Sequence, residues 1–329
     1  MFKIIQRRNI WLVFSAILCS VSILSLIFFG LKFGIDFTGG SLIEVEFSTN
    51  RPANEEISKA LNNSGLTNLY VQPVGEKGVI LRTEAINEEK HQEIIKKLKD
   101  TFATEINLNK NNSTSTETQV GGLTVDLSKT PLNQIEEVRF DSIGPIIGQE
   151  LKNKAIVAIF LVLIAIIIYL AYAFRKVSRP VPSWQYGLAA VIALAHDILI
   201  VTGIFSILGH FFNIQIDALF VTALLTILGF SVHDTIVTFD RIRENIFRQQ
   251  DKTFEDVINI SINETINRSI NTSLTTLIVL TAILLFGGAS VKYFSLALIF
   301  GIIVGTYSSI FVASPLVLIW YHWKFKKVS

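Results

Sequence analysis

The chain has 329 residues, a formal net charge of +2, a hydrophobic fraction of 50% and a mean hydropathy of +0.49. This composition is too apolar for a soluble protein of that length, and it indicates several membrane-spanning helices. The small net charge and the lack of a basic, aromatic-interleaved patch argue against nucleic-acid binding. The single cysteine, Cys19, excludes an internal disulfide.

The first apolar segment, residues 10–31, follows a basic N-terminus that contains Lys3, Arg7 and Arg8. It is long enough to cross a bilayer, and no small-x-small cleavage site follows it, so we interpret it as a spanning helix and not as a signal peptide.

The next part of the chain, residues 34–151, is polar and changes its hydrophobic period several times. Residues 41–47 alternate, with Ile43, Val45 and Phe47 on one face and Glu44 and Glu46 on the other, which predicts a strand. The later segments predict a helix, two strands, a helix and a last strand at residues 53–63, 66–74, 78–84, 87–102 and 134–140. This order is that of a ferredoxin-like α+β domain. The polar segment 104–130 is assigned no function.

Five more apolar segments follow, and they complete a polytopic α-helical membrane protein with six transmembrane helices. They cover residues 155–174, 184–208, 216–239, 270–286 and 293–320. Lys and Arg concentrate in the two termini and in alternate connections, which places both termini in the cytoplasm and the ferredoxin-like domain outside. The expected organisation is a first helix, an external domain, five helices with a cytoplasmic loop at 240–267, and a cytoplasmic tail, at residues 1–33, 34–151, 152–322 and 323–329.

The predicted cytoplasmic loop 240–267 contains an amphipathic pattern. Thr253 and Asp256 have the spacing of a capping box, and the apolar residues that follow share one helical face: Phe254, Val257, Ile258, Ile262 and Ile266. Two interpretations remain open, a helix on the membrane surface or against a partner, and packing against the inner end of the chain's own bundle.

Asp234 is the first candidate functional residue, because it is a carboxylate inside the fourth apolar segment. A charged side chain near the bilayer centre costs on the order of 3 kcal/mol, so it is retained only where it is paired, hydrated or used. In the next segment Arg268 begins a polar helical face that we expect to point into the bundle, and that continues through Asn271, Thr272, Thr275 and Thr276. This pattern predicts a proton pathway of Asp234, Arg268, Thr272, Thr275 and Thr276, and the alternative is a static ion pair that joins two helices.

Three other polar residues lie within apolar segments and are candidates for an extended proton relay. His196 and Asp197 occur together in the third segment, and His233 precedes Asp234. For His196 and Asp197 the alternative is hydrogen bonding to a neighbouring helix. No motif such as H-E-x-x-H or a P-loop is present, so we expect no metal, no cofactor and no nucleotide hydrolysis. Gly301 and Gly305 predict close helix packing.

Five motifs together resemble the SecF family of the bacterial SecDF protein-export complex. They are GIDFTGG at residues 34–40, IGPIIG at 143–148, ALAHD at 193–197, GFSVHDTIVTFDRIREN at 229–245, and Arg268 with the Thr/Ser-rich sequence after it. The first contains the family motif residues Gly34, Asp36, Gly39 and Gly40.

The resemblance implies a fold of the resistance-nodulation-division (RND) type, which pairs with SecD in a twelve-helix unit in the bacterial inner membrane. It implies association with the SecYEG channel, with translocating preproteins and membrane lipid, and with YajC and YidC as further partners. The unit would use the proton-motive force without catalysing a covalent reaction. Asp234 and Arg268 fall where the family's proton-pathway residues lie, and His233 stands where many relatives have Asn. The competing functions are a non-catalytic scaffold subunit and a small-molecule or lipid exporter of the same superfamily.

Overall fold

The computed structural model describes residues 2–104, 134–173 and 181–326. The chain divides into two compact units, one formed by Met1–Phe33 with Asn153–Ser329 and the other by Gly34–Lys152. Most of the polar segment 104–130 lies outside the described residues. The same is true of Arg175, Lys176 and Arg179, which contributed to the predicted orientation.

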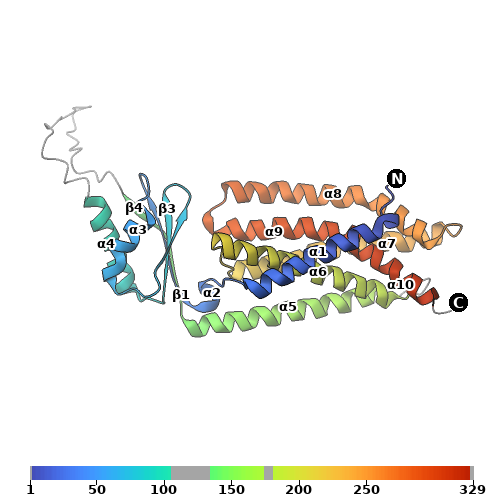
Figure 1. Cartoon of the computed structure of the whole chain (residues 1–329), viewed down its shortest axis with the longest axis horizontal. Coiled ribbons are helices and arrows are strands. Elements are labelled where there is room, and N and C mark those ends of the chain that lie inside the picture. The colour runs from blue at the N-terminus through green and yellow to red at the C-terminus, as the bar shows by residue number, and fades with distance from the viewer. Residues whose placement is uncertain (1, 105–133, 174–180, 327–329) are drawn as a thin grey trace, which may run out of the picture. The chain divides into compact units, whose positions relative to one another are not determined.

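The smaller unit contains a four-stranded antiparallel sheet with strand order β2-β3-β1-β4 (Figure 1). Its elements are β1 Gly40–Phe47, α3 Asn54–Leu61, β2 Tyr70–Val74, β3 Gly78–Thr83, α4 Glu88–Thr104 and β4 Ile135–Ile143. Helix α3 connects β1 to β2, and β3 lies between these two strands in the sheet, as in a ferredoxin-like domain. The prediction of this domain is therefore confirmed.

The core of this domain follows the period-two pattern of β1. Ile43, Val45 and Phe47 are at most 1% exposed and pack against residues of β3, α3 and α4, among them Leu81, Ile57, Ile94 and Leu98. One face of the sheet is therefore covered by the two helices. Glu44 lies on the opposite face, yet it is also buried, at 9% exposure.

Burial raises the pKa of Glu44, and the nearby Arg139 partly opposes this effect. A carboxyl group with a raised pKa in the folded state binds more protons there than in the unfolded state, so it stabilises the fold less as pH rises from about 4.5. We expect Glu44→Gln to stabilise the sheet at pH 7 relative to the parent chain, and to have little effect at pH 4. Amide hydrogen exchange of β1 and β3 in the full chain measures this difference.

The exposed Glu76, in the turn between β2 and β3, offers a matched control. Glu76→Gln should leave the exchange rates of β1 and β3 unchanged at both pH values. Equal protection in the parent chain and Glu44→Gln at pH 7 would contradict the predicted contribution of Glu44.

The paired glycines of the GIDFTGG motif lie where backbone segments approach closely. Gly39 has φ +74°, and a Cβ there would lie 2.7 Å from the Cα of Pro145, at the start of helix α5 (Pro145–Ala173). A Cβ at Gly148 would meet the backbone nitrogen of Gly39 at 2.8 Å. The motif residues Gly34 and Asp36 begin the short helix α2 (Ile35–Thr38), which precedes Gly39 and β1. The glycines therefore let the start of α5 pack directly on the junction of α2 and β1.

The larger unit contains six helices that are long and apolar enough to cross a membrane, which confirms the predicted number within the described residues. The first is η1 Ile5–Arg7 joined to α1 Arg8–Phe28, and the next four are α5, α6 Ser183–Phe212, α7 Ala218–Arg248 and α8 Phe254–Phe286. The sixth consists of α9 Ala289–Ser308, the π-helical segment η5 Ser309–Ala313 and α10 Ser314–Lys326.

The prediction of a loop at residues 240–267 is wrong. Helix α7 continues to Arg248 and α8 begins at Phe254, so the two helices form a hairpin with a short turn. The predicted cap is present, with the Thr253 hydroxyl accepting a hydrogen bond from the Asp256 amide at 3.2 Å. Charged side chains here continue both helices instead of ending them, because long polar side chains are good helix formers outside the apolar core.

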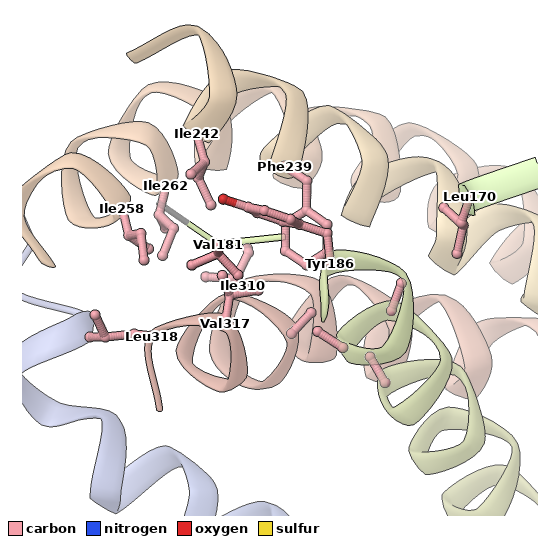
Figure 2. Packing of buried hydrophobic residues seen from close by; sticks show 14 of the residues in the cluster. Leu170, Val181, Tyr186, Phe239, Ile242, Ile258, Ile262, Ile310, Val317 and Leu318 are labelled. Carbon is pink, nitrogen blue, oxygen red and sulfur yellow. The ribbon is translucent and has the colours of Figure 1, made fainter. Parts of the chain in front are cut away.

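The apolar face at the start of α8 packs against the chain's own bundle, which was one of the two alternatives. Phe254, Ile258 and Ile262 share a core with Ile5 and Leu318, from near the two ends of the chain. Figure 2 shows Ile258 and Ile262 close to Val317 and Leu318, with Tyr186 and Phe239 beside them. Both termini and the α7–α8 turn therefore lie at one end of the unit, which we call the terminal end (Figure 1).

Small residues allow the closest helix contacts in the bundle. A Cβ at Gly301 of α9 would overlap the side chain of Ile227 of α7, and a Cβ at Gly305 would lie 3.0 Å from the Cβ of Ser231. The predicted packing role of Gly301 and Gly305 is confirmed, and it holds α9 against α7 beside the polar residues described next.

Candidate functional site

Asp197 lies at a junction of three helices in the middle of the bundle. It is 0% exposed, and it stands near the midpoint of α6. Its Oδ2 accepts hydrogen bonds from the hydroxyls of Ser231 on α7, at 2.6 Å, and Ser308 on α9, at 2.8 Å. Its Oδ1 lies 3.0 Å from Nδ1 of His196. These contacts provide the polar partners that a buried carboxylate requires.

The π-helical segment Ser309–Ala313 begins immediately after this junction. Ser309 Oγ lies 2.9 Å from Oγ1 of Thr235 on α7, and Ser309 also donates to the backbone oxygen of Gly305 at 2.9 Å. A π segment widens one helical turn and commonly occurs at functional sites. Here it follows Ser308, which donates to Asp197 of α6, and it begins with Ser309, which contacts Thr235 of α7.

Asp234 on α7 is the second buried carboxylate of the bundle, at 4% exposure. The hydroxyls of Ser269 on α8 and Thr306 on α9 lie near its carboxylate. Thr306 Oγ1 is in turn 2.5 Å from Oγ of Ser273. The Asp234 Oδ2 atom is buried and has no hydrogen-bond partner among the described residues. An unpartnered buried carboxylate oxygen is costly, and this cost suggests that the group is used.

The polar face of α8 does not point into this chain's bundle, so that part of the prediction is wrong. Its residues Arg268, Asn271, Thr272 and Thr275 are exposed on the surface of the chain, and Thr276 is half-buried. The buried face of α8 carries Ser269 and Ser273 instead. Helical periodicity shows that α8 has a polar face, but it does not show what packs on that face. In this structure no part of the described chain covers it, so a surface outside this chain would have to cover it.

Asp234 and Arg268 lie near each other without forming an ion pair in the described part of the chain. Arg268 lies one residue before Ser269, whose hydroxyl is near the Asp234 carboxylate. His233 itself is exposed, whereas His196 is 7% exposed and its Nε2 has no hydrogen-bond partner among residues with described side chains.

A polar cavity of about 320 Å³ lies between α7 and α8 toward the terminal end. Its lining residues are Val237, Asp240, Arg241, Glu244, Glu264, Thr265 and Arg268. Arg268, from the exposed polar face of α8, is thus one of its lining residues. No group of three His, Cys, Asp or Glu side chains suited to a metal ion occurs within residues 2–104, 134–173 and 181–326.

The sequence-based prediction found both carboxylates but not their partners. Ser231, Ser308 and Ser309 are single hydroxyls in apolar helices, where most serines bond only to their own backbone. The consecutive serines in the sixth span were the available signal. The cavity was missed because five of its seven lining residues fall in the predicted loop 240–267.

Comparisons with known proteins agree with this architecture. The family model "Protein export membrane protein SecD/SecF, C-terminal" matches residues 124–323, and the "SecD/SecF GG Motif" model matches residues 24–50. Two similar relatives are each named "Protein translocase subunit SecF". The one from Thermobaculum terrenum is 40% identical, over 100% of this chain and 96% of its own length. The one from Anaerolinea thermophila is 38% identical, over 97% and 94%.

A crystal structure of SecDF from Thermus thermophilus, described as a translocon-associated membrane protein, has a similar fold. The TM-score is 0.77 at 28% identity, over 98% of this chain. The chain spans 39% of the length of that SecDF chain. The matched family models, the full-length relatives and the shared fold agree, and the chain belongs to the SecF family of protein translocase subunits, which act in protein export.

Proposed function

We propose that this chain, paired with SecD, uses the proton-motive force to promote translocation of preproteins through the SecYEG channel. Asp234 is the proton-binding group of this chain, and Arg268 tunes it. The observation that carries the proposal is the buried, incompletely hydrogen-bonded carboxylate of Asp234 beside a polar helix face that this chain leaves exposed. Binding and release of the proton form and break only the O–H bond of the proton carrier, and no other covalent bond changes.

SecD is the partner that this proposal places over the polar face of α8. Arg268 and Thr272 lie within a membrane-spanning helix, where an exposed guanidinium and hydroxyl are unfavourable against lipid. A second set of helices with complementary polar groups would cover them. The SecDF relative supports this assignment, because the present chain spans only part of it. Association with YajC and YidC is still only a prediction, and it rests on the family resemblance.

The orientation is also part of the proposal. By the positive-inside rule the terminal end is cytoplasmic, and the ferredoxin-like domain is on the outer side of the bacterial inner membrane, where it contacts the emerging polypeptide. Moving one charge through 100 mV supplies about 2.3 kcal/mol, which biases a two-state domain movement. Protonation removes the charge of Asp234 next to Ser269 and Thr306, and so favours a shift among α7, α8 and α9.

The test is export of a reporter preprotein in vesicles that contain SecYEG, with and without this chain and SecD. The pair should increase completed export, and a protonophore should remove that increase while ATP is held constant. An increase that persists with the protonophore would contradict a proton-driven role and favour the alternative of a scaffold subunit.

A further inference from the structure

Helix α4 and strand β4 of the ferredoxin-like domain hold a buried histidine between them. His91 of α4 is 3% exposed, and its ring stacks on that of Phe140 of β4, with the ring centroids 3.8 Å apart and the planes 2° from parallel. The site belongs to the smaller unit and shares no residue with the helical bundle. A polar ring that is buried this completely needs partners for both of its nitrogens.

Both ring nitrogens of His91 lie beside carboxylate oxygens. Nδ1 is 3.2 Å from Oε1 of Glu88, one turn earlier on α4, and Nε2 is 3.0 Å from Oε1 of Glu137 on β4. Nε2 has no aligned hydrogen bond among the described residues, so its contact with Glu137 depends on charge. A neutral imidazole has one N–H and one lone pair, so in either tautomer one carboxylate faces a lone pair. Only the imidazolium ion can donate toward both carboxylates, and the arrangement is therefore complementary to the protonated histidine.

A β-bulge in β4 turns Glu137 toward His91. Phe140 is opposite Ile43 of β1 and Glu137 is opposite Val45, and both of these β1 residues lie on the face that the helices cover. In a regular strand, residues 137 and 140 would point to opposite faces. The register shift between β1 and β4 adds one residue to β4 between them, which brings both side chains to the same face.

The two carboxylates are the charged groups that face His91. The pKa of Glu88 is lowered, first by a hydrogen bond from Gln92 at 2.6 Å and then by His91, so this carboxyl is ionised near neutral pH. The acidic residues of β1 point to the opposite face of the sheet, as do Glu136 and Arg139 of β4. Helix α3 packs against the same core, and within the described part of the domain its charged side chains form no ion pair with His91; they are Glu55, Glu56 and Lys59.

We propose that His91, Glu88, Glu137 and Phe140 form a proton-operated clasp, which holds β4 on α4 when His91 is protonated and loosens when it is neutral. The proton binds at the ring lone pair and forms an N–H bond, and no other covalent bond changes. Histidine is the side chain that most commonly changes charge between about pH 5 and 8. Because the folded domain favours the charged form, the clasp contributes stability on the acidic side of this range and loses it as pH rises.

The position of β4 gives the clasp its consequence. Strand β4 is at the edge of the sheet, with β1 as its neighbour, so its contacts with α4 are a second attachment. It ends at Ile143, and α5, the second membrane-spanning helix, begins at Pro145. In the proposed orientation the clasp responds to the pH of the outer side, which the proton-motive force keeps acidic. That last consequence rests on the proposed orientation, whereas the clasp itself does not.

The experiment measures amide hydrogen exchange of β4 in the full chain at pH 6 and pH 8, corrected for the intrinsic effect of pH on exchange. In the parent chain β4 should be about fivefold better protected at pH 6, as expected for the gain of a charge-assisted contact. His91→Gln should remove this pH difference, even if the substitution loosens the strand at both pH values. An equal pH difference in His91→Gln and in the parent chain would overturn the proposal.

Two neighbouring glutamates separate the clasp from general effects of charge on β4. Glu137→Gln keeps the histidine but removes its partner on β4, so it should also remove most of the pH difference. Glu136→Gln is the matched control, because Glu136 is opposite Glu46 on the other face of the sheet, and this variant should keep the parent difference. Equal pH differences in the two variants would overturn the clasp. The measurement needs neither export nor SecD, so its failure would leave the proposed function standing.

Discussion

Asp234→Asn is expected to abolish the proton-driven part of preprotein export while the chain still assembles with SecD. Asparagine has nearly the same shape as aspartate and retains one acceptor oxygen for Ser269 and Thr306, but it cannot bind and release a proton. The energy at stake is about 2.3 kcal/mol per charge in a potential of 100 mV, which corresponds to roughly a forty-fold bias in a two-state equilibrium. Export of a reporter preprotein in energised vesicles, at matched abundance, measures this loss.

Asp251→Asn provides the matched control for Asp234→Asn. Asp251 lies in the exposed turn between α7 and α8, so its loss changes the same charge without touching the buried site. This variant should export at the parent rate. Parent-level export by Asp234→Asn, still sensitive to protonophore, would show that another group carries the proton.

Asp197→Leu is expected to destabilise the bundle strongly. The substitution removes the acceptor shared by Ser231 and Ser308 and leaves these hydroxyls and His196 without their partner in the interior. Unpartnered buried polar groups cost about 1–3 kcal/mol each, so the total loss should be on the order of 3 kcal/mol or more. Thermal unfolding of the purified chain in detergent would show a markedly lower midpoint.

Asp197→Asn separates a structural role from a relay role at this position. The amide retains an oxygen for one serine, and its NH2 group can donate to the hydroxyl oxygen of the other. We expect this variant to be folded and to keep most proton-driven export, in contrast to Asp234→Asn. Loss of export by a stable Asp197→Asn would instead make Asp197 part of the relay. Asp251→Leu is the stability control, and it should unfold near the parent temperature.

In the ferredoxin-like domain, a local sequence pattern was sufficient to predict strand β1 and its buried face. Ile43, Val45 and Phe47 alternate with Glu44 and Glu46, and a strand with this period has only one way to bury its apolar side chains. The prediction did not anticipate the burial of Glu44 on the opposite face. In the sheet, Glu44 is paired with Arg139 of β4, which lies almost a hundred residues later in the chain.

The sequence by itself determined the six apolar helices, the ferredoxin-like domain and the two candidate acids, Asp197 and Asp234. Each follows from hydrophobic length, from short-range periodicity, or from the cost of a charge in an apolar segment, and all three are local properties.

Only the tertiary structure decided what surrounds those acids. It joined Asp197 to Ser231 and Ser308 across three helices, and it turned the Arg268 face outward from this chain. It also replaced the expected loop by a helical hairpin with a cavity that Arg268 and Glu264 line. The physical reason is that one helix can satisfy its own backbone, whereas the partners of a buried side chain come from other helices, and their rotation about their axes is set by packing at residues such as Gly301.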